Sequence, residues 1–256
     1  MIHVDRRSAM DGTGAPAPPR TLGVLGGMGP AATAEFLRLL TAAVPARSDQ
    51  EHPRVVMLSE PGIPERTSAI LTGTDEPLSA IRDGLLQLAA WGADLLAVPC
   101  NTAHAFVDRM EGELPVPLVH IVDVTLRAAI RTSPDGGWLA ATAGTVRSEL
   151  YQRRAAEHGY RLLVPDPAEQ DRIHRAGVLV KAGRGDEAGT LLRQSVHGMW
   201  RQHDLPVLTA CTELPIAYTA GGLPEQRSVS SLAALASACA GRLLAPRPVA
   251  VGGARR

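Results

Sequence analysis

Two cysteines occupy the same kind of position in this sequence. Cys100 comes shortly after the apolar run at 95–98, and Cys211 ends the apolar segment that begins at Leu205. In both places the chain then turns polar and a helical pattern begins. A thiol at the start of a helix lies beside free N–H groups, which lower its pKa and attract anions. Because the arrangement occurs twice, the sequence predicts one site with a thiol on each side.

A free cysteine at the end of a strand can also be a small core residue. The residues that follow the two thiols argue for function, because a core cysteine needs no polar donors beside it: they are Asn101 and Thr102 in one motif, and Thr212 and Glu213 in the other. The third cysteine, Cys239, lies among small apolar residues of the last predicted helix. We interpret Cys239 as a packing residue.

A metal site is the first alternative for the Cys100 motif. His104 follows Cys100 at a spacing of four residues, which on a helix places two metal ligands on one face. A zinc site needs further ligands, and the remaining histidines are scattered along the sequence without partners. The sequence therefore favours His104 as a packing or supporting residue.

A nucleotide site is the second alternative. The turn that starts Gly27-Met28-Gly29-Pro30 fits the pattern G-x-G-x-x-A after a predicted strand. The acidic residue that would confirm it is Glu60, at the end of the second strand, but the spacing exceeds the expected roughly 20 residues. The sequence therefore favours a tight strand-to-helix connection whose N–H groups face an anionic ligand.

The composition excludes several classes of function. The 256 residues include 26 basic and 26 acidic side chains, so no net charge favours nucleic acid or a membrane surface. Aromatic residues make up 3%, too few for a base-stacking surface. Three cysteines cannot form a disulfide framework, and no apolar run reaches the roughly 18 residues of a spanning helix. We expect a cytoplasmic protein with a small-molecule ligand.

The elements that carry the two thiols alternate between strands and helices. Predicted strands lie at 21–27, 54–60, 95–98, 116–122, 138–142, 161–164 and 205–211; predicted helices lie at 30–44, 75–91, 143–158, 167–182, 186–203 and 228–244. A long loop is expected at 61–74, and disordered tails at 1–20 and 246–256. Regular alternation predicts an α/β fold with parallel sheets. The pattern restarts near residue 124, so two similar halves are expected to face each other across a cleft.

Several motifs resemble the cofactor-independent aspartate/glutamate racemases, and aspartate racemase most of all. They are LGVLGGMGP, DQEHPRV, IPERT, PCNTAHAF, LAATAGT, VKAG and ACTELP, which together extend from about Thr21 to Leu244. The resemblance implies two α/β lobes related by pseudo-twofold symmetry and assembly as a homodimer. It also implies that the last helix returns to the first lobe. We therefore expect lobe one at 21–123 plus about 226–245, and lobe two at 124–225.

The resemblance further implies the site residues. Cys100 and Cys211 would lie on opposite faces of the substrate Cα, one removing the α-proton and the other returning a proton from the far side, with no pyridoxal phosphate and no metal. Arg66 and Lys181 match positions that bind the side-chain carboxylate of aspartate. The substrate-binding residues implied in all are Met28, Arg66, Asn101, Thr102, Thr145, Lys181 and Thr212.

Three functions follow from these observations. The first is racemisation of aspartate or glutamate, with the preferred acid and the resting thiolate left open. The second uses the same fold for maleate-isomerase-like or decarboxylase chemistry on a dicarboxylate. The third, from a different class, is a nucleotide-dependent oxidoreductase, and it depends on the glycine turn alone.

Overall fold

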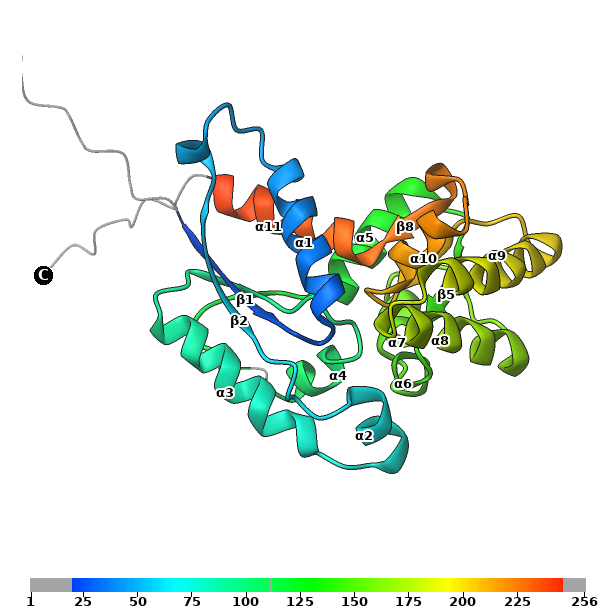
Figure 1. The fold of residues 1–256 in the computed structure, drawn as a ribbon, viewed down its shortest axis with the longest axis horizontal. Coiled ribbons are helices and arrows are strands. Elements are labelled where there is room, and N and C mark those ends of the chain that lie inside the picture. The colour runs from blue at the N-terminus through cyan, green and yellow to red at the C-terminus, as the bar shows by residue number, and fades with distance from the viewer. Residues whose placement is uncertain (1–19, 111, 246–256) are drawn as a thin grey trace, which may run out of the picture.

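Two four-stranded parallel sheets organise the computed structural model, which describes residues 20–110 and 112–245 (Figure 1). The first sheet has the strand order β2-β1-β3-β4 and the second the order β6-β5-β7-β8. The strands are β1 (Thr21–Gly26), β2 (Arg54–Ser59), β3 (Leu95–Ala97), β4 (Leu118–Val119), β5 (Gly137–Ala141), β6 (Leu162–Leu163), β7 (Val207–Ala210) and β8 (Ser228–Ser230). The second sheet thus repeats the strand order of the first, and the predicted two-lobe α/β fold is confirmed.

Helices connect these strands, because parallel neighbours need a crossover between the end of one strand and the start of the next. They are α1 (Pro30–Ala43), α2 (Arg66–Thr72), α3 (Glu76–Ala90), α4 (His104–Val107), α5 (Ile121–Thr132), α6 (Ala143–Arg147), α7 (Leu150–Glu157), α8 (Pro167–Lys181), α9 (Gly185–Gln202), α10 (Leu214–Ala220) and α11 (Ser231–Leu244). The central strands β1, β3, β5 and β7 are buried along their whole length. Their continuous apolar runs are typical of strands covered on both faces.

Four predicted elements differ from the observed ones. The expected loop at 61–74 contains α2, whose first turn is capped by the Glu65 carboxylate accepting from Ser68 N–H across 2.7 Å. The strand expected at 116–122 is only β4, because α5 already begins at Ile121. The helix expected at 143–158 is divided at Glu149, which has a φ of 57°. The first three residues of the helix expected at 228–244 instead form β8, which pairs with β7, and α11 begins at Ser231.

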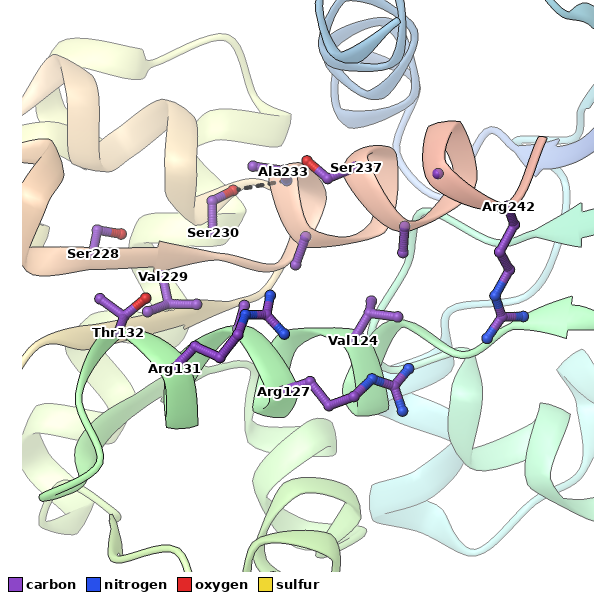
Figure 2. A pocket seen from close by; sticks show the side chains of 14 residues that line it. Val124, Arg127, Arg131, Thr132, Ser228, Val229, Ser230, Ala233, Ser237 and Arg242 are labelled. Atoms are coloured by element: carbon purple, nitrogen blue, oxygen red, sulfur yellow. Dashed lines mark hydrogen bonds between the residues drawn. The ribbon is translucent and has the colours of Figure 1, made fainter. Parts of the chain in front are cut away.

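Two segments cross between the sheets. The first is α5, and the second is β8 followed by α11; they lie side by side along a groove lined by Arg127, Arg131 and Arg242 (Figure 2). β8 belongs to the second sheet, whereas α11 packs against both α1 and α5. One core cluster accordingly joins side chains of both sheets, among them Leu22 of β1 and Leu208 of β7. The lobe boundaries at 123 and 225 stay a prediction.

The predicted tails at 1–20 and 246–256 fall outside the described residues, apart from Arg20. Across the part of the chain that is described, no helix combines the length and the apolar character needed to cross a bilayer.

Candidate active site

The two cysteines lie at equivalent positions of the two sheets. Cys100 follows β3 and Cys211 follows β7, and each of these strands is third in the order of its sheet. Both thiols are free and buried. They line one small cavity of about 10 Å³ together with nine other residues: Met28, Glu65, Arg66, Asn101, Thr102, Thr142, Lys181, Thr212 and Glu213. The structure therefore brings both predicted thiols to one place, with residues of both lobes around them.

Ends of parallel strands form this cavity. Met28 follows β1 and Thr142 follows β5, and these two strands are again equivalent in the two sheets. Ligands of open parallel sheets bind at the carboxyl ends of the strands, where the chain turns toward the next helix. Here two such edges face each other, so each lobe supplies the residues that follow its two central strands.

A larger cavity of about 460 Å³ adjoins the small one. The two share the side chains of Glu65, Thr142, Lys181 and Cys211. The remaining lining comes from α2 and α8, including His174 of α8, which accepts a hydrogen bond from Ala143 N–H across 3.4 Å. Open space thus reaches the Cys211 side of the thiol site between helices of the two lobes.

Three threonine hydroxyls join the lobes beside the cavity. Thr102 Oγ1 lies 2.9 Å from Thr142 Oγ1 and 2.9 Å from Thr145 Oγ1, and Thr142 Oγ1 lies 3.0 Å from Thr145 Oγ1. Gly144 permits this approach, since a Cβ atom there would lie 2.8 Å from Thr67 Cα. Of the predicted residues, Thr102 lines the cavity, whereas Thr145 lies behind it in the hydroxyl cluster.

Asn101 is held by groups from far along the chain. Its Nδ2 donates to Ser231 Oγ across 2.9 Å, and its Oδ1 accepts from the Tyr151 hydroxyl across 2.6 Å. Both partners are fully buried. The side chain of Asn101 is therefore fixed, and with it the backbone that carries Cys100.

Two cationic side chains, Arg66 and Lys181, line the cavity. Arg66 is buried; its guanidinium donates to the carbonyls of Ile63 and Pro64 across 3.0 Å each, and its Nε has no partner among the described residues. Lys181 has a side chain that is 38% exposed, and its Nζ lies 3.9 Å from Glu65 Oε1. Burial has the largest effect on the pKa of Lys181 and lowers it, but the charges of Glu213, Cys211 and Cys100 together outweigh burial and leave the pKa raised.

Glu213 is one of three cavity residues to which the sequence assigned no substrate-binding role. Its Oε2 accepts from Cys211 Sγ across 3.1 Å and from Thr212 Oγ1 across 3.2 Å. Burial and the adjacent Glu213 carboxylate raise the pKa of the Cys211 thiol well above its ordinary value. The lowered thiol pKa expected from a helix start is therefore wrong for Cys211, because burial and a neighbouring negative charge dominate there.

Thr142 and Glu65 were also not selected, although both line the cavity. For two of these three residues, the place in the sequence indicates a role in the site. Thr142 directly follows a central strand, and Glu213 stands second after its cysteine, as Thr102 does after Cys100.

His104 is a packing residue, as the sequence favoured. Its Nδ1 lies 2.9 Å from the Cys100 carbonyl oxygen, and its Nε2 accepts from Ile121 N–H across 3.3 Å. Both ring nitrogens are thereby occupied, and burial lowers the pKa of His104 well below its ordinary value. Cys239 lies in the core, where burial raises its pKa to about 12.

The glycine turn is explained by packing. Gly27 has a φ of 91°, and a Cβ atom there would lie 2.5 Å from the backbone nitrogen of Glu60. The carboxylate of Glu60, the acidic residue of the nucleotide-site alternative, accepts from Gly62 N–H across 3.0 Å. The turn instead places Met28 in the thiol-lined cavity.

Comparison with known proteins assigns the class. The model of the Asp/Glu/hydantoin racemase family matches residues 25–239. The broad specificity amino-acid racemase RacX of Bacillus subtilis (strain 168) is 28% identical over 197 residues, covering 75% of this chain and 85% of the relative. These matches extend over most of both lobes.

Solved structures agree with the sequence comparison. The aspartate racemase of Picrophilus torridus aligns with a TM-score of 0.76 and 28% identity, covering 88% of this chain and 94% of that chain. The glutamate racemase of Campylobacter jejuni subsp. jejuni shares the fold, with a TM-score of 0.60 and 19% identity over 87% of this chain and 85% of that chain. The fold and the sequence thus define an amino-acid racemase, which is an isomerase. The chain belongs to the Asp/Glu/hydantoin racemase family.

Proposed function

We propose that this protein interconverts the L and D forms of an acidic amino acid, aspartate or glutamate, by two-cysteine acid–base catalysis without a cofactor. One observation carries the proposal: Cys100 and Cys211 follow equivalent strands of the two lobes and line the same cavity. Inversion of a carbon centre requires that a proton leaves one face and another arrives on the opposite face. A thiol from each lobe is the simplest arrangement for this reaction.

In this mechanism one thiolate takes the α-proton, and the second, protonated thiol then donates a proton from the other side. The contact between Cys211 Sγ and Glu213 Oε2 supports Cys211 as the protonated partner at rest. We then assign Cys100 as the group that takes the α-proton first. The carbanion that forms between the two steps is stabilised by donors to the α-carboxylate, for which Thr102 and the backbone N–H groups of Asn101 and Thr212 are the candidates.

Two cations support an acidic substrate. A substrate such as aspartate brings two carboxylates into the cavity, and Arg66 and Lys181 both line it. The unpartnered Nε of Arg66 leaves a buried donor for a carboxylate oxygen. The Picrophilus torridus relative is named an aspartate racemase, whereas RacX is named a broad specificity enzyme. We therefore place aspartate first and expect other amino acids to be slower.

The direct test follows the circular dichroism of L-aspartate, D-aspartate and both forms of glutamate during incubation with the purified protein and no added cofactor. Loss of signal from both enantiomers of one acid supports the proposal. Racemisation of alanine at the rate of aspartate would contradict the acidic substrate, and optical stability of all these acids would contradict the function.

The homodimer and the cytoplasmic location implied at the sequence level stay predictions. Light scattering during size-exclusion chromatography gives the mass in solution. A mass near twice the 27.0 kDa of one chain would confirm the dimer.

A further inference from the structure

Glu213 carries a buried carboxylate oxygen with no partner. The residue is 2% exposed, and its Oε2 is engaged with Cys211 Sγ and Thr212 Oγ1. Its Oε1 has no hydrogen-bond partner within the described ranges. Leaving a buried carboxylate oxygen without a donor destabilises the fold, so such an atom calls for a ligand that satisfies it.

The other carboxylate of the cavity is not comparable. Glu65 has a side chain that is 52% exposed; its Oε2 caps α2 through Ser68 N–H, and its Oε1 lies 3.9 Å from Lys181 Nζ. One oxygen of Glu65 therefore accepts a hydrogen bond from the backbone, and the other lies in an ion pair on a half-exposed side chain. Among the described residues that line the cavity, Glu213 provides the buried negative charge that remains open to a ligand.

We propose that Glu213 Oε1 binds the α-ammonium group of the amino-acid substrate. For proton transfer, the substrate Cα must lie within reach of Cys211 Sγ, and the ammonium nitrogen is bonded directly to that Cα. Glu213 Oε2 shares a hydrogen bond with the same thiol across 3.1 Å, and Glu213 lines the same cavity. The second oxygen of this carboxylate is therefore close to the position that the substrate Cα and its ammonium group must occupy. The inference rests on the proposed function only in placing an amino acid between the thiols.

Gly29 of the opposite lobe leaves space beside this oxygen. A Cβ atom on Gly29 would lie 3.0 Å from Glu213 Oε1, a distance at which one of the two groups must move. The turn after β1 therefore approaches Glu213 without a side chain. Gly29→Ala is a second way to disturb the oxygen while the carboxylate itself is unchanged.

The subsite divides recognition into two parts. Every α-amino acid carries the ammonium, whereas only an acidic one carries the second carboxylate that Arg66 and Lys181 are proposed to bind. An anionic contact for the ammonium also balances charge, since the charges of Arg66 and Lys181 offset the two negative charges of an acidic substrate and leave its ammonium charge to be matched. A purely supporting role for Glu213, limited to holding the Cys211 thiol, is the alternative that the experiment must exclude.

The experiment compares L-aspartate with succinate, which is the same dicarboxylate without the ammonium. Isothermal titration measures both dissociation constants for the parent, Glu213→Gln, Gly29→Ala and the control Glu157→Gln, which changes an exposed glutamate on α7. We expect the parent to bind aspartate at least about tenfold more tightly than succinate. Glu213→Gln should raise the dissociation constant of aspartate about tenfold or more relative to the parent. The dissociation constant of succinate should stay equal to that of the parent or decrease.

Gly29→Ala should also weaken aspartate more than succinate, and Glu157→Gln should change neither. If Glu213→Gln fails to fold, Gly29→Ala and the parent still test the inference, because both compare aspartate binding with succinate binding. If Glu213→Gln weakened the binding of aspartate and of succinate equally, Glu213 would only hold the Cys211 thiol in place, and the inference would be overturned. A parent that binds succinate as well as aspartate would also overturn it, whether or not the parent racemises aspartate. Absence of racemisation alone, with the aspartate preference intact, would overturn the proposed function instead.

Discussion

Asn101 Nδ2 donates a hydrogen bond to Ser231 Oγ across 2.9 Å, although the two residues lie 130 positions apart in the chain. The same Ser231 hydroxyl donates to the carbonyl oxygen of Thr209 across 2.8 Å. Asn101 is adjacent to Cys100, and Thr209 lies two residues before Cys211. A single hydroxyl at the start of α11 therefore connects the two segments that carry the thiols.

Ser231→Ala should impair this connection. It removes the acceptor of Asn101 and the donor to Thr209 at a fully buried position, which should lower the free energy of unfolding by about 1–3 kcal/mol. We expect kcat to fall more than KM rises, because the thiols lose their relative placement. Urea unfolding and steady-state kinetics measure the two effects. Ser237→Ala, on the exposed face of the same helix, is the control and should stay within about 0.5 kcal/mol of the parent.

The cysteines themselves give the second prediction. Cys100→Ser and Cys211→Ser should each lower racemisation by about 10²–10⁴-fold or more, because a serine hydroxyl is a far weaker acid–base group at neutral pH. Thermal unfolding should show that both variants remain folded. Cys239→Ser, in the core away from the cavity, should keep its activity. Full activity of either catalytic variant would exclude the two-base mechanism.

Isotope exchange tests whether the thiols lie on opposite faces of the substrate. In D2O, each single-cysteine variant should exchange the α-proton of the enantiomer whose hydrogen faces the remaining thiol. Proton NMR of L- and D-aspartate should therefore reveal opposite preferences for the two variants. The same preference in both would place the two thiols on one side.

The sequence located the thiol site because its signals are local. An apolar run, a cysteine and polar residues are contiguous, and parallel strands bring their carboxyl ends together. The short helix α2 was not predicted, since it depends on the Glu65 cap rather than on an apolar period. The open oxygen of Glu213 and the bond between Asn101 and Ser231 were beyond reach for another reason: they arise only when distant segments meet.

Substrate specificity gives the fourth prediction. Arg66→Ala should lower kcat/KM for aspartate by roughly 30- to 1000-fold, which corresponds to about 2–4 kcal/mol for a charge-assisted contact in a buried cleft. Lys181→Ala should have a smaller effect, because its side chain is 38% exposed and solvent screens its charge. Alkylation of the thiols by iodoacetamide should be retained in both. If both variants kept parental kinetics, neither cation would contact the substrate.

The last prediction concerns pH and His104. Burial, the charge of His120 and the charge of Arg154 lower the pKa of His104, and they outweigh the Cys100 carbonyl and Asp108, which raise it. The ring is neutral in the fold, with Nε2 accepting from Ile121 N–H, and a proton on Nε2 would remove that acceptor.

Because the folded pKa lies below the unfolded value of about 6.5, the unfolded chain binds the extra proton first as the pH falls. His104 therefore contributes stability that is present above about pH 6.5 and is lost below it, at up to about 1.4 kcal/mol per pH unit. Urea unfolding at a series of pH values between 7 and 5 should show this decline in the parent. His104→Gln, which does not titrate, should show a shallower slope over the same range. An unchanged slope in the variant would mean that His104 takes up its proton without opening the contact between α5 and the Cys100 segment.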